Sequence, residues 1–326
     1  MIKPFHRTLI ILFALAPLTS CGSDDAQGPA SSDDPKDATP AQNNNITNAI
    51  FTRSEPGCAS YVGEYYAEVT DVANQKTLNA SVTISDGGDT CTFSSNSIPN
   101  HDFNQNGSFA NDVKEVVETF QIPKNPTAAT SSTALSLSYD NAVFLNGVKL
   151  DLLAAACYGV GNEPLGKEKI GCFEEKPWRY DPMFGGNNFG TDTHNAHTQP
   201  DGAYHYHGSP EAMFADDGSV ASPVIGFAAD GFPIFGPYID DNGSIRKVIS
   251  GYTLKAGART DMPGQGALPP GDYDGTFRDD YEFTSAGDLD ACNGMTRNGS
   301  YGYYITDTFP WVLGCFTGTP HASFQK

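Results

Sequence analysis

Residues 143–150 read VFLNGVKL and residues 227–234 read FAADGFPI. Each is an apolar run broken by an Asn-Gly or Asp-Gly turn. Two later pairs of segments align in the same order: 192–197 with 290–295, and 204–207 with 301–304. The pattern predicts two related halves, about 140–215 and 224–318, packed on one core. Coincidental similarity between turn-rich strands is the alternative.

The composition supports a mainly β chain, either all-β or α+β with little helix. The chain has 34 Gly and 22 Pro among 326 residues, and only 18% of residues are charged, a balance that suits short strands and long loops. Alternating apolar residues predict a hairpin over 81–93 and a strand over 135–139, whereas residues 113, 116, 117 and 120 fall at helical spacing and predict a short helix over 111–121. We expect a single large domain.

The N-terminus resembles an export signal. Lys3 and Arg7 precede the apolar stretch 8–18, and Leu-Thr-Ser-Cys at 18–21 resembles the bacterial lipobox, which implies a signal peptide over 1–20 and acylation of Cys21. A simple secretory signal is the alternative. Gly22 after the cysteine favours the outer membrane of a bacterial cell envelope. Residues 21–50 are acidic and poor in apolar residues, so we expect a disordered tether before a domain over 51–326, whose first β part covers 51–139.

The net charge limits the kinds of binding partner, and the cysteine content indicates disulfide bonds. The formal net charge is −20, which would repel a phosphate backbone and argues against nucleic acid. No apolar run is long enough to span a bilayer, so the lipid anchor is the expected membrane contact, and protein partners are unknown. Without Cys21, six cysteines remain, and in an exported chain they favour disulfides between sequence neighbours. The expected pairs are Cys58–Cys91, Cys157–Cys172 and Cys292–Cys315. Metal thiolates are the alternative, but no Cys-x-x-Cys spacing is present.

Four histidines fall within fourteen residues: His194, His197, His205 and His207. If 204–207 is a strand, His205 and His207 point to one face while the intervening tyrosines point to the other. The turn at 199–202 would fold the first two histidines back against this pair. Such a nitrogen-rich site suits a transition metal, Cu(II) or Zn(II), better than calcium or magnesium. The alternative is half-exposed strand histidines stacked on tyrosines.

The tetrapeptide Tyr-His-Tyr-His at 204–207 resembles the one that gives the YHYH-domain proteins their name. Similar segments are SNSIPNH at 95–101, NGV at 146–148, SPVIGFAADGFPIFGP at 222–237, DYDGTF at 272–277, LDACNG at 289–294 and FPWVLGC at 309–315. The resemblance covers about 85–318 and implies one shared fold. It adds His101 as a candidate ligand. His197 matches a histidine of the family's Cys-x-Gly-His segment, but His194 stands where that cysteine is usual.

Three classes of function follow. The first is an envelope lipoprotein that binds or handles a transition metal through His101, His194, His197, His205 and His207, with Asp230 either orienting a ligand from outside the coordination shell or forming a turn. The second is a metal-dependent hydrolase outside the cytoplasm, with Glu211 or Asp230 as the nearby carboxylate. The third is a structural or adhesive domain that uses Tyr204, Tyr206, Trp178 and Trp311 for packing or glycan stacking. Whether the chain is an enzyme is left open.

Overall fold

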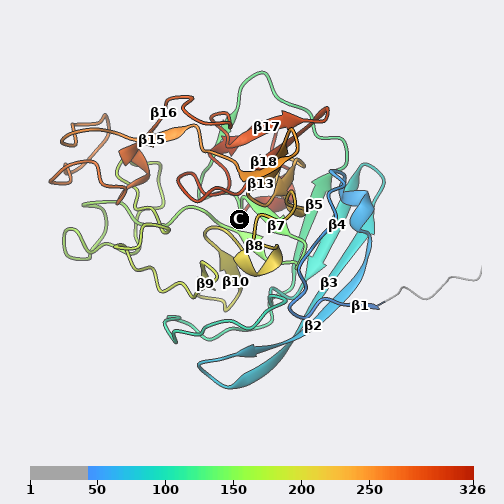
Figure 1. Ribbon diagram of the computed structural model, residues 1–326. Coiled ribbons are helices and arrows are strands. Elements are labelled where there is room, and N and C mark those ends of the chain that lie inside the picture. Colours follow the sequence, from blue (N-terminus) through green and yellow to red (C-terminus); the bar gives the residue numbers. More distant parts are fainter. Residues whose placement is uncertain (1–42) are drawn as a thin grey trace, which may run out of the picture. The chain divides into compact units, whose positions relative to one another are not determined.

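The computed structural model describes residues 43–326, and strands dominate this part of the chain (Figure 1). The expected signal peptide, Cys21 and most of the expected tether lie outside it. The helices within it are short 3-10 turns: η1 (Cys58–Tyr61), η2 (Glu211–Met213), η3 (Arg278–Asp280) and η4 (Ala322–Phe324). The predicted mainly β fold is confirmed. No helix among these residues combines the length and apolar character needed to cross a bilayer.

A five-stranded sheet is built from the N-terminal part of the chain. Its strands lie in sequence order: β1 (Asn43–Asn45), β2 (Gly63–Asp71), β3 (Lys76–Asp86), β4 (Thr90–Ser95) and β5 (Glu118–Pro123). Along β3, Leu78, Ala80, Val82 and Ile84 are buried while the residues between them are exposed, because successive side chains of a strand point to opposite faces. The hairpin predicted over 81–93 is confirmed as part of β3 and β4.

Three local predictions differ from the structure. Residues 111–117 form no helix; the backbone N–H of Lys114 donates to Gly202 and that of Val116 to Asn96, so contacts distant in sequence replace helical ones. The strand expected over 135–139 is also absent, and the pairing instead occurs at β6 (Thr133–Ala134). The tether expected to reach residue 50 is ordered from β1 onward, because β1 pairs with β2 and Ile46 is buried beside it.

The second sheet has eight strands and carries both predicted halves. Their order is β17-β18-β12-β11-β7-β8-β10-β9. The bounds are β7 (Ala142–Phe144), β8 (Lys149–Leu150), β9 (Ala196–Thr198), β10 (Tyr204–Tyr206), β11 (Val224–Ala228), β12 (Pro233–Phe235), β17 (Gly294–Arg297) and β18 (Ser300–Tyr304). Since β7 pairs antiparallel with β11 at the centre, each half contributes four adjacent strands, and the strand order of one half mirrors that of the other.

Corresponding hydrogen bonds occur in the two halves. In the first half Asn146, in the β7–β8 turn, donates to the Tyr206 hydroxyl, 3.1 Å away. In the second half Asp230, in the β11–β12 turn, accepts from the Tyr303 hydroxyl. Both parallel pairings, β8 with β10 and β12 with β18, also correspond. The repeat seen in the sequence is therefore a repeat of structure.

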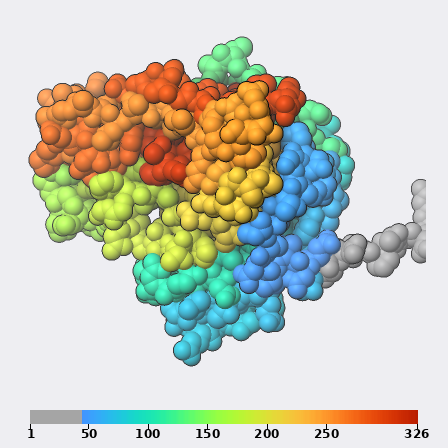
Figure 2. All heavy atoms as spheres, in the orientation of Figure 1, coloured from blue at the N-terminus to red at the C-terminus, as the bar shows by residue number. Residues whose placement is uncertain are grey.

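The two sheets share one hydrophobic core. The rings of Phe93 and Phe227 lie 6.0 Å apart edge to face, and on the face shown in Figure 2 the blue N-terminal residues border yellow and orange residues of later segments. Short hairpins complete the fold: β13 (Tyr238–Asp241) with β14 (Ser244–Lys247), β15 (Tyr252–Leu254) with β16 (Tyr281–Phe283), and β6 with β19 (Cys315–Phe316).

Three disulfides join Cys58 to Cys91, Cys157 to Cys172 and Cys292 to Cys315. These are the pairs expected from the sequence. The first holds η1 against β4 of the five-stranded sheet. The third joins the loop before β17 to β19, so that bond lies within the second half.

Gly147→Ala is expected to destabilise the protein by about 3 kcal/mol, because a left-handed non-glycine residue and an overpacked contact each cost about 1–2 kcal/mol. Gly147 has φ +82°, and an added Cβ would lie 2.5 Å from Cβ of Ser95 in the other sheet. The matched control is Gly243→Ala, where φ is +92° and nothing lies within 4 Å. Urea unfolding of both variants measures the difference, and equal losses would contradict this account of the turn.

Candidate metal centre

The hairpin of β9 and β10 brings three histidines together on one face. His197 and His205 are direct cross-strand partners, so their side chains project to the same side of the sheet. His207 follows His205 by two residues and points the same way. Gly202, with φ +98°, lies in the turn that reverses the chain between the strands. The sequence spacing of His205 and His207, together with the register of the hairpin, thus places the rings of His197, His205 and His207 in one group.

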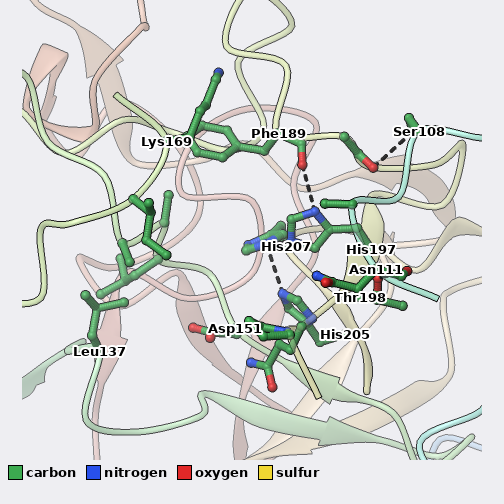
Figure 3. Close-up of a pocket in the computed structure, with 18 of the residues that line it drawn as sticks. Ser108, Asn111, Leu137, Asp151, Lys169, Phe189, His197, Thr198, His205 and His207 are labelled. Carbon is green, nitrogen blue, oxygen red and sulfur yellow. Dashed lines mark hydrogen bonds between the residues drawn. The ribbon is translucent and has the colours of Figure 1, made fainter. Parts of the chain in front are cut away.

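The Nε2 atoms of the three rings face one another (Figure 3). His207 Nε2 lies 3.1 Å from that of His205 and 3.0 Å from that of His197. Ligand atoms at about 2.0–2.1 Å around a tetrahedral zinc ion lie about 3.3 Å from one another. Two of the three pairs therefore have nearly the spacing that such an ion requires, and all three ligand atoms lie within 4.8 Å of one another.

The protonation of His197 follows from its surroundings. Its Nδ1 lies 2.7 Å from the carbonyl oxygen of Phe189, and since a carbonyl only accepts, Nδ1 carries the proton and Nε2 presents a lone pair. This is the usual way in which a second hydrogen bond fixes the tautomer of a metal-binding imidazole.

Hydrogen bonds alone cannot satisfy the three Nε2 atoms. His207 Nε2 faces two nitrogens but holds at most one proton, so it can donate to only one neighbour. If His207 Nε2 instead accepts a proton from His205 Nε2, its lone pair is directed at the Nε2 lone pair of His197, and the two nitrogens repel each other. A cation at the centre removes the conflict, because all three lone pairs then point toward positive charge. Nδ1 of His205 and of His207 is buried with no hydrogen-bond partner among residues 43–326, so these two rings are held by packing.

Burial keeps the rings uncharged. His205 and His207 are 3% and 5% exposed, and their burial lowers the pKa of each well below its ordinary value, with the neighbouring histidines adding to the effect. Burial also lowers the pKa of His197. Neutral imidazole is the form that binds a metal.

The three rings line one end of a cavity of about 770 Å³. Its walls are mainly apolar, and its lining includes Leu137, Leu153, Ile170, Phe173 and Phe189. Asp151 also lines it. A metal held by the histidines would therefore face a mainly apolar cavity.

Two lysines and three carboxylates form an ion-pair cluster next to this group. Lys149 Nζ lies 2.5 Å from Glu118 and 3.6 Å from Asp140. Lys326 pairs with Asp140 at 3.2 Å and with Asp151. Asp151 Oδ1 has no hydrogen-bond partner in the described part of the chain. One carboxylate oxygen of a cavity-lining residue is thus buried without a partner among residues 43–326.

The structure does not bring His101 and His194 to this group. His101 lies on the opposite face of β10, where its Nε2 accepts from the Tyr206 hydroxyl at 2.7 Å and its Nδ1 donates to the carbonyl of Asp102 at 2.9 Å. His194 packs on the His101 ring, with centroids 4.0 Å apart. Both nitrogens of His101 are already bonded, so the candidate ligand set reduces to His197, His205 and His207.

Asp230 is also remote from the histidines. It accepts hydrogen bonds from Tyr303, Gly318 and Phe232 in the second half, so it stabilises a turn and orients no ligand. Glu211, the other carboxylate suggested for hydrolysis, is not among the cavity residues. Tyr204, Tyr206 and Trp178 are buried and have no surface to offer a glycan.

Sequence reasoning missed Asp151, Lys326 and Phe189. Asp151 directly follows β8, which pairs in parallel with β10, and no local pattern reveals such a long-range pairing. Phe189 contributes a backbone carbonyl, which carries no side-chain signal.

Fold and site together define a disulfide-bonded, mainly β protein with a three-histidine group at the base of a cavity. The family model described as "YHYH protein" matches residues 119–318, which is more than half of the chain. The chain therefore belongs to the YHYH family, as its motifs suggested. No curated protein and no solved structure matches it.

His101 is expected to make stability dependent on pH. Burial, with a smaller contribution from His194, lowers its pKa to about 3, whereas the unfolded chain binds a proton near pH 6.5. The stability that neutral His101 provides is thus complete above about pH 6.5 and falls by about 1.4 kcal/mol per pH unit below it. Between about pH 7 and pH 5, His101→Gln should therefore lose about 2 kcal/mol less than the wild type in urea unfolding. Parallel losses in His101→Gln and the wild type would contradict the assignment.

Proposed function

We propose that the protein binds a transition metal, Zn(II) or Cu(II), through Nε2 of His197, His205 and His207. The observation that carries this proposal is the convergence of three buried nitrogens that cannot satisfy one another by hydrogen bonds. An all-imidazole set suits zinc and copper and is poor for calcium or magnesium. Burial supports it further, because the rings stay neutral where exposed histidines begin to protonate.

Reconstitution of metal-free, untagged protein tests this proposal. After dialysis against Zn(II) or Cu(II) and removal of loosely bound ions, elemental analysis should find about one equivalent per chain. The melting temperature should rise with the concentration of free metal, because an ion that binds only the folded state stabilises it. Less than about 0.2 equivalents of either metal, with no thermal shift, would reject the proposal.

Metal-dependent hydrolysis is a second candidate, and the cavity is the observation that favours it. Three protein ligands on a zinc ion leave one coordination position open, so that the ion supplies a Lewis acid. Here that position would face the cavity, where the buried Asp151 keeps one oxygen unpartnered among the described residues. Asp151 is thus the carboxylate that can accept a proton at this site. Metal-dependent turnover of an ester, amide or phosphoester that falls in Asp151→Asn, at unchanged metal content, supports this candidate. Turnover that Asp151→Asn leaves unchanged counts against it.

The location at the cell envelope is also a proposal, and it rests on the sequence of residues 1–21. With the native N-terminus, the protein should sediment with washed membranes. Cys21→Ser should release it, because the acyl chains supply the affinity for the bilayer. Equal membrane association of both proteins would exclude lipidation as the anchor.

A further inference from the structure

We propose that the cavity beside the histidines binds a neutral, largely apolar small molecule that presents one electron-pair donor group to the metal. The ligand has two parts: a donor end, which would bind the metal, and an apolar end, which would fill the cavity. Binding of the donor end rests on the proposed metal site, whereas binding of the apolar end rests on the cavity alone. The two ends can therefore be tested separately.

The volume of the cavity identifies the size of the occupant. About 770 Å³ lies within the range of about 300–1,000 Å³ that is typical of small-molecule sites. A bare metal ion with its waters needs only a small part of this space. The cavity is thus large enough for an organic molecule of drug-like size that reaches from the histidines to the rim.

The walls identify its polarity. Leu137, Leu153 and Phe189 line the cavity, and Ile170 and Phe173 do so while remaining 56% and 68% exposed. A ligand in the cavity that covered these two side chains would remove their apolar surface from water, which is favourable. Phe173 directly follows Cys172 and Ile170 precedes it by two residues, and the disulfide of Cys172 to Cys157 ties this segment to the fold. The two side chains thus form an apolar rim of the cavity.

The charges around the cavity favour a neutral ligand. Lys326 is paired with Asp140 and Asp151. Lys169 donates to the carbonyl of Asn187 and lies 4.4 Å from the centre of the Phe189 ring, and in Figure 3 its ammonium group points away from the histidines. The charge of Lys326 is thus balanced by two carboxylates, and the chain's net charge of −20 repels anions at long range. Among residues 43–326, the two lysines that line the cavity already interact with other groups, so neither is free to pair with an anionic ligand.

Binding of the neutral fluorophore N-phenyl-1-naphthylamine to metal-free protein tests the apolar end. We expect saturable fluorescence enhancement at one site, weakened about tenfold in the double variant Ile170→Ser/Phe173→Ser, since both side chains lose apolar contact with the probe. The matched control is Val117→Ser/Val220→Ser, because these valines are 78% and 59% exposed but lie outside the cavity lining. Absence of binding, or equal loss in the two double variants, would overturn the inference.

Comparing imidazole with 4-phenylimidazole on the zinc-loaded protein tests the donor end. Both ligands offer the same kind of nitrogen to the metal. We expect 4-phenylimidazole to bind about tenfold more tightly, and this difference measures the contact of its phenyl group with the apolar wall of the cavity. This advantage should shrink in Ile170→Ser/Phe173→Ser and persist in the control. If zinc does not bind while the fluorophore behaves as expected, the metal proposal and the donor end fail, but the apolar site stands. If zinc binds and the phenyl group confers no advantage, the inference fails and the metal proposal survives.

Discussion

Replacing His205 and His207 together with alanine is expected to abolish stoichiometric metal binding. Two of the three converging Nε2 atoms are lost, and a single nitrogen from His197 cannot hold the ion. Losing one outer partner of a ligand already costs about 10–100-fold in affinity, so we expect the loss of two ligands to exceed that range. Metal content by elemental analysis and the metal-induced rise in melting temperature are the measurements.

The control for this variant is His194→Ala/His321→Ala, which removes two histidines outside the group. It should bind metal as the wild type does. Since alanine leaves space in a buried region, His207→Gln provides a second test that nearly preserves the side-chain volume. If the cluster variants retain the metal, or if the control loses it, the assignment of the ligands is wrong.

Asp192→Asn is expected to destabilise the protein by about 2–4 kcal/mol, because charge-assisted hydrogen bonds are lost in a buried place. Asp192 Oδ1 accepts from the backbone N–H of His194 at 2.9 Å and of Ala196 at 3.3 Å. Its Oδ2 accepts from the Tyr204 hydroxyl at 3.0 Å and from the N–H of Asn104 at 3.1 Å. An amide has one acceptor oxygen in place of two, so one pair of donors loses its partner.

The same substitution should weaken metal binding about 10–100-fold, because Asp192 holds the start of β9, where His197 lies. The second half offers a matched control. Asp290 accepts from Cys292, Gly294 and Tyr301, which are the counterparts of His194, Ala196 and Tyr204. Because Asp290 is exposed, Asp290→Asn should cost less stability than Asp192→Asn, and it should leave the metal affinity unchanged. Urea unfolding and metal titration of both variants separate the two effects, and an equal drop in affinity would show that Asp192 acts only through global stability.

Patterns that are local in the sequence predicted the fold well. The Gly-Gly turn at 87–88 determined the β3–β4 hairpin, and the Asn-Gly and Asp-Gly turns identified the two repeated hairpins, because turn chemistry acts within a few residues. The helix predicted over 111–121 was wrong because this segment satisfies its backbone through Gly202 and Asn96, which no local period encodes.

The site was predicted in part for the same reason. The spacing of His205 and His207 is a strand signal, and His197 joins them through a tight turn. The structure does not place His101 and His194 in the group. His101 lies on the other face of β10 beside Tyr204 and Tyr206, and His194 packs on the His101 ring. Asp151 depends on the parallel pairing of β8 with β10, whose partners are 56 residues apart, as the registers of Lys149 and His205 show. Such pairings are determined by tertiary structure.

The two halves of the eight-stranded sheet meet where β7 pairs with β11, and this pairing has a consequence for a cleaved form of the protein. The segment joining the halves is exposed at Asp216, Asp217 and Val220, while every residue of β7 and β11 is buried. A protease that nicks this segment would leave two fragments whose apolar edges can be covered only by each other. We expect the fragments to co-elute as one particle and, when produced separately, to reassemble by complementation. The histidine hairpin lies wholly in the first fragment, yet that fragment needs its companion to stay soluble.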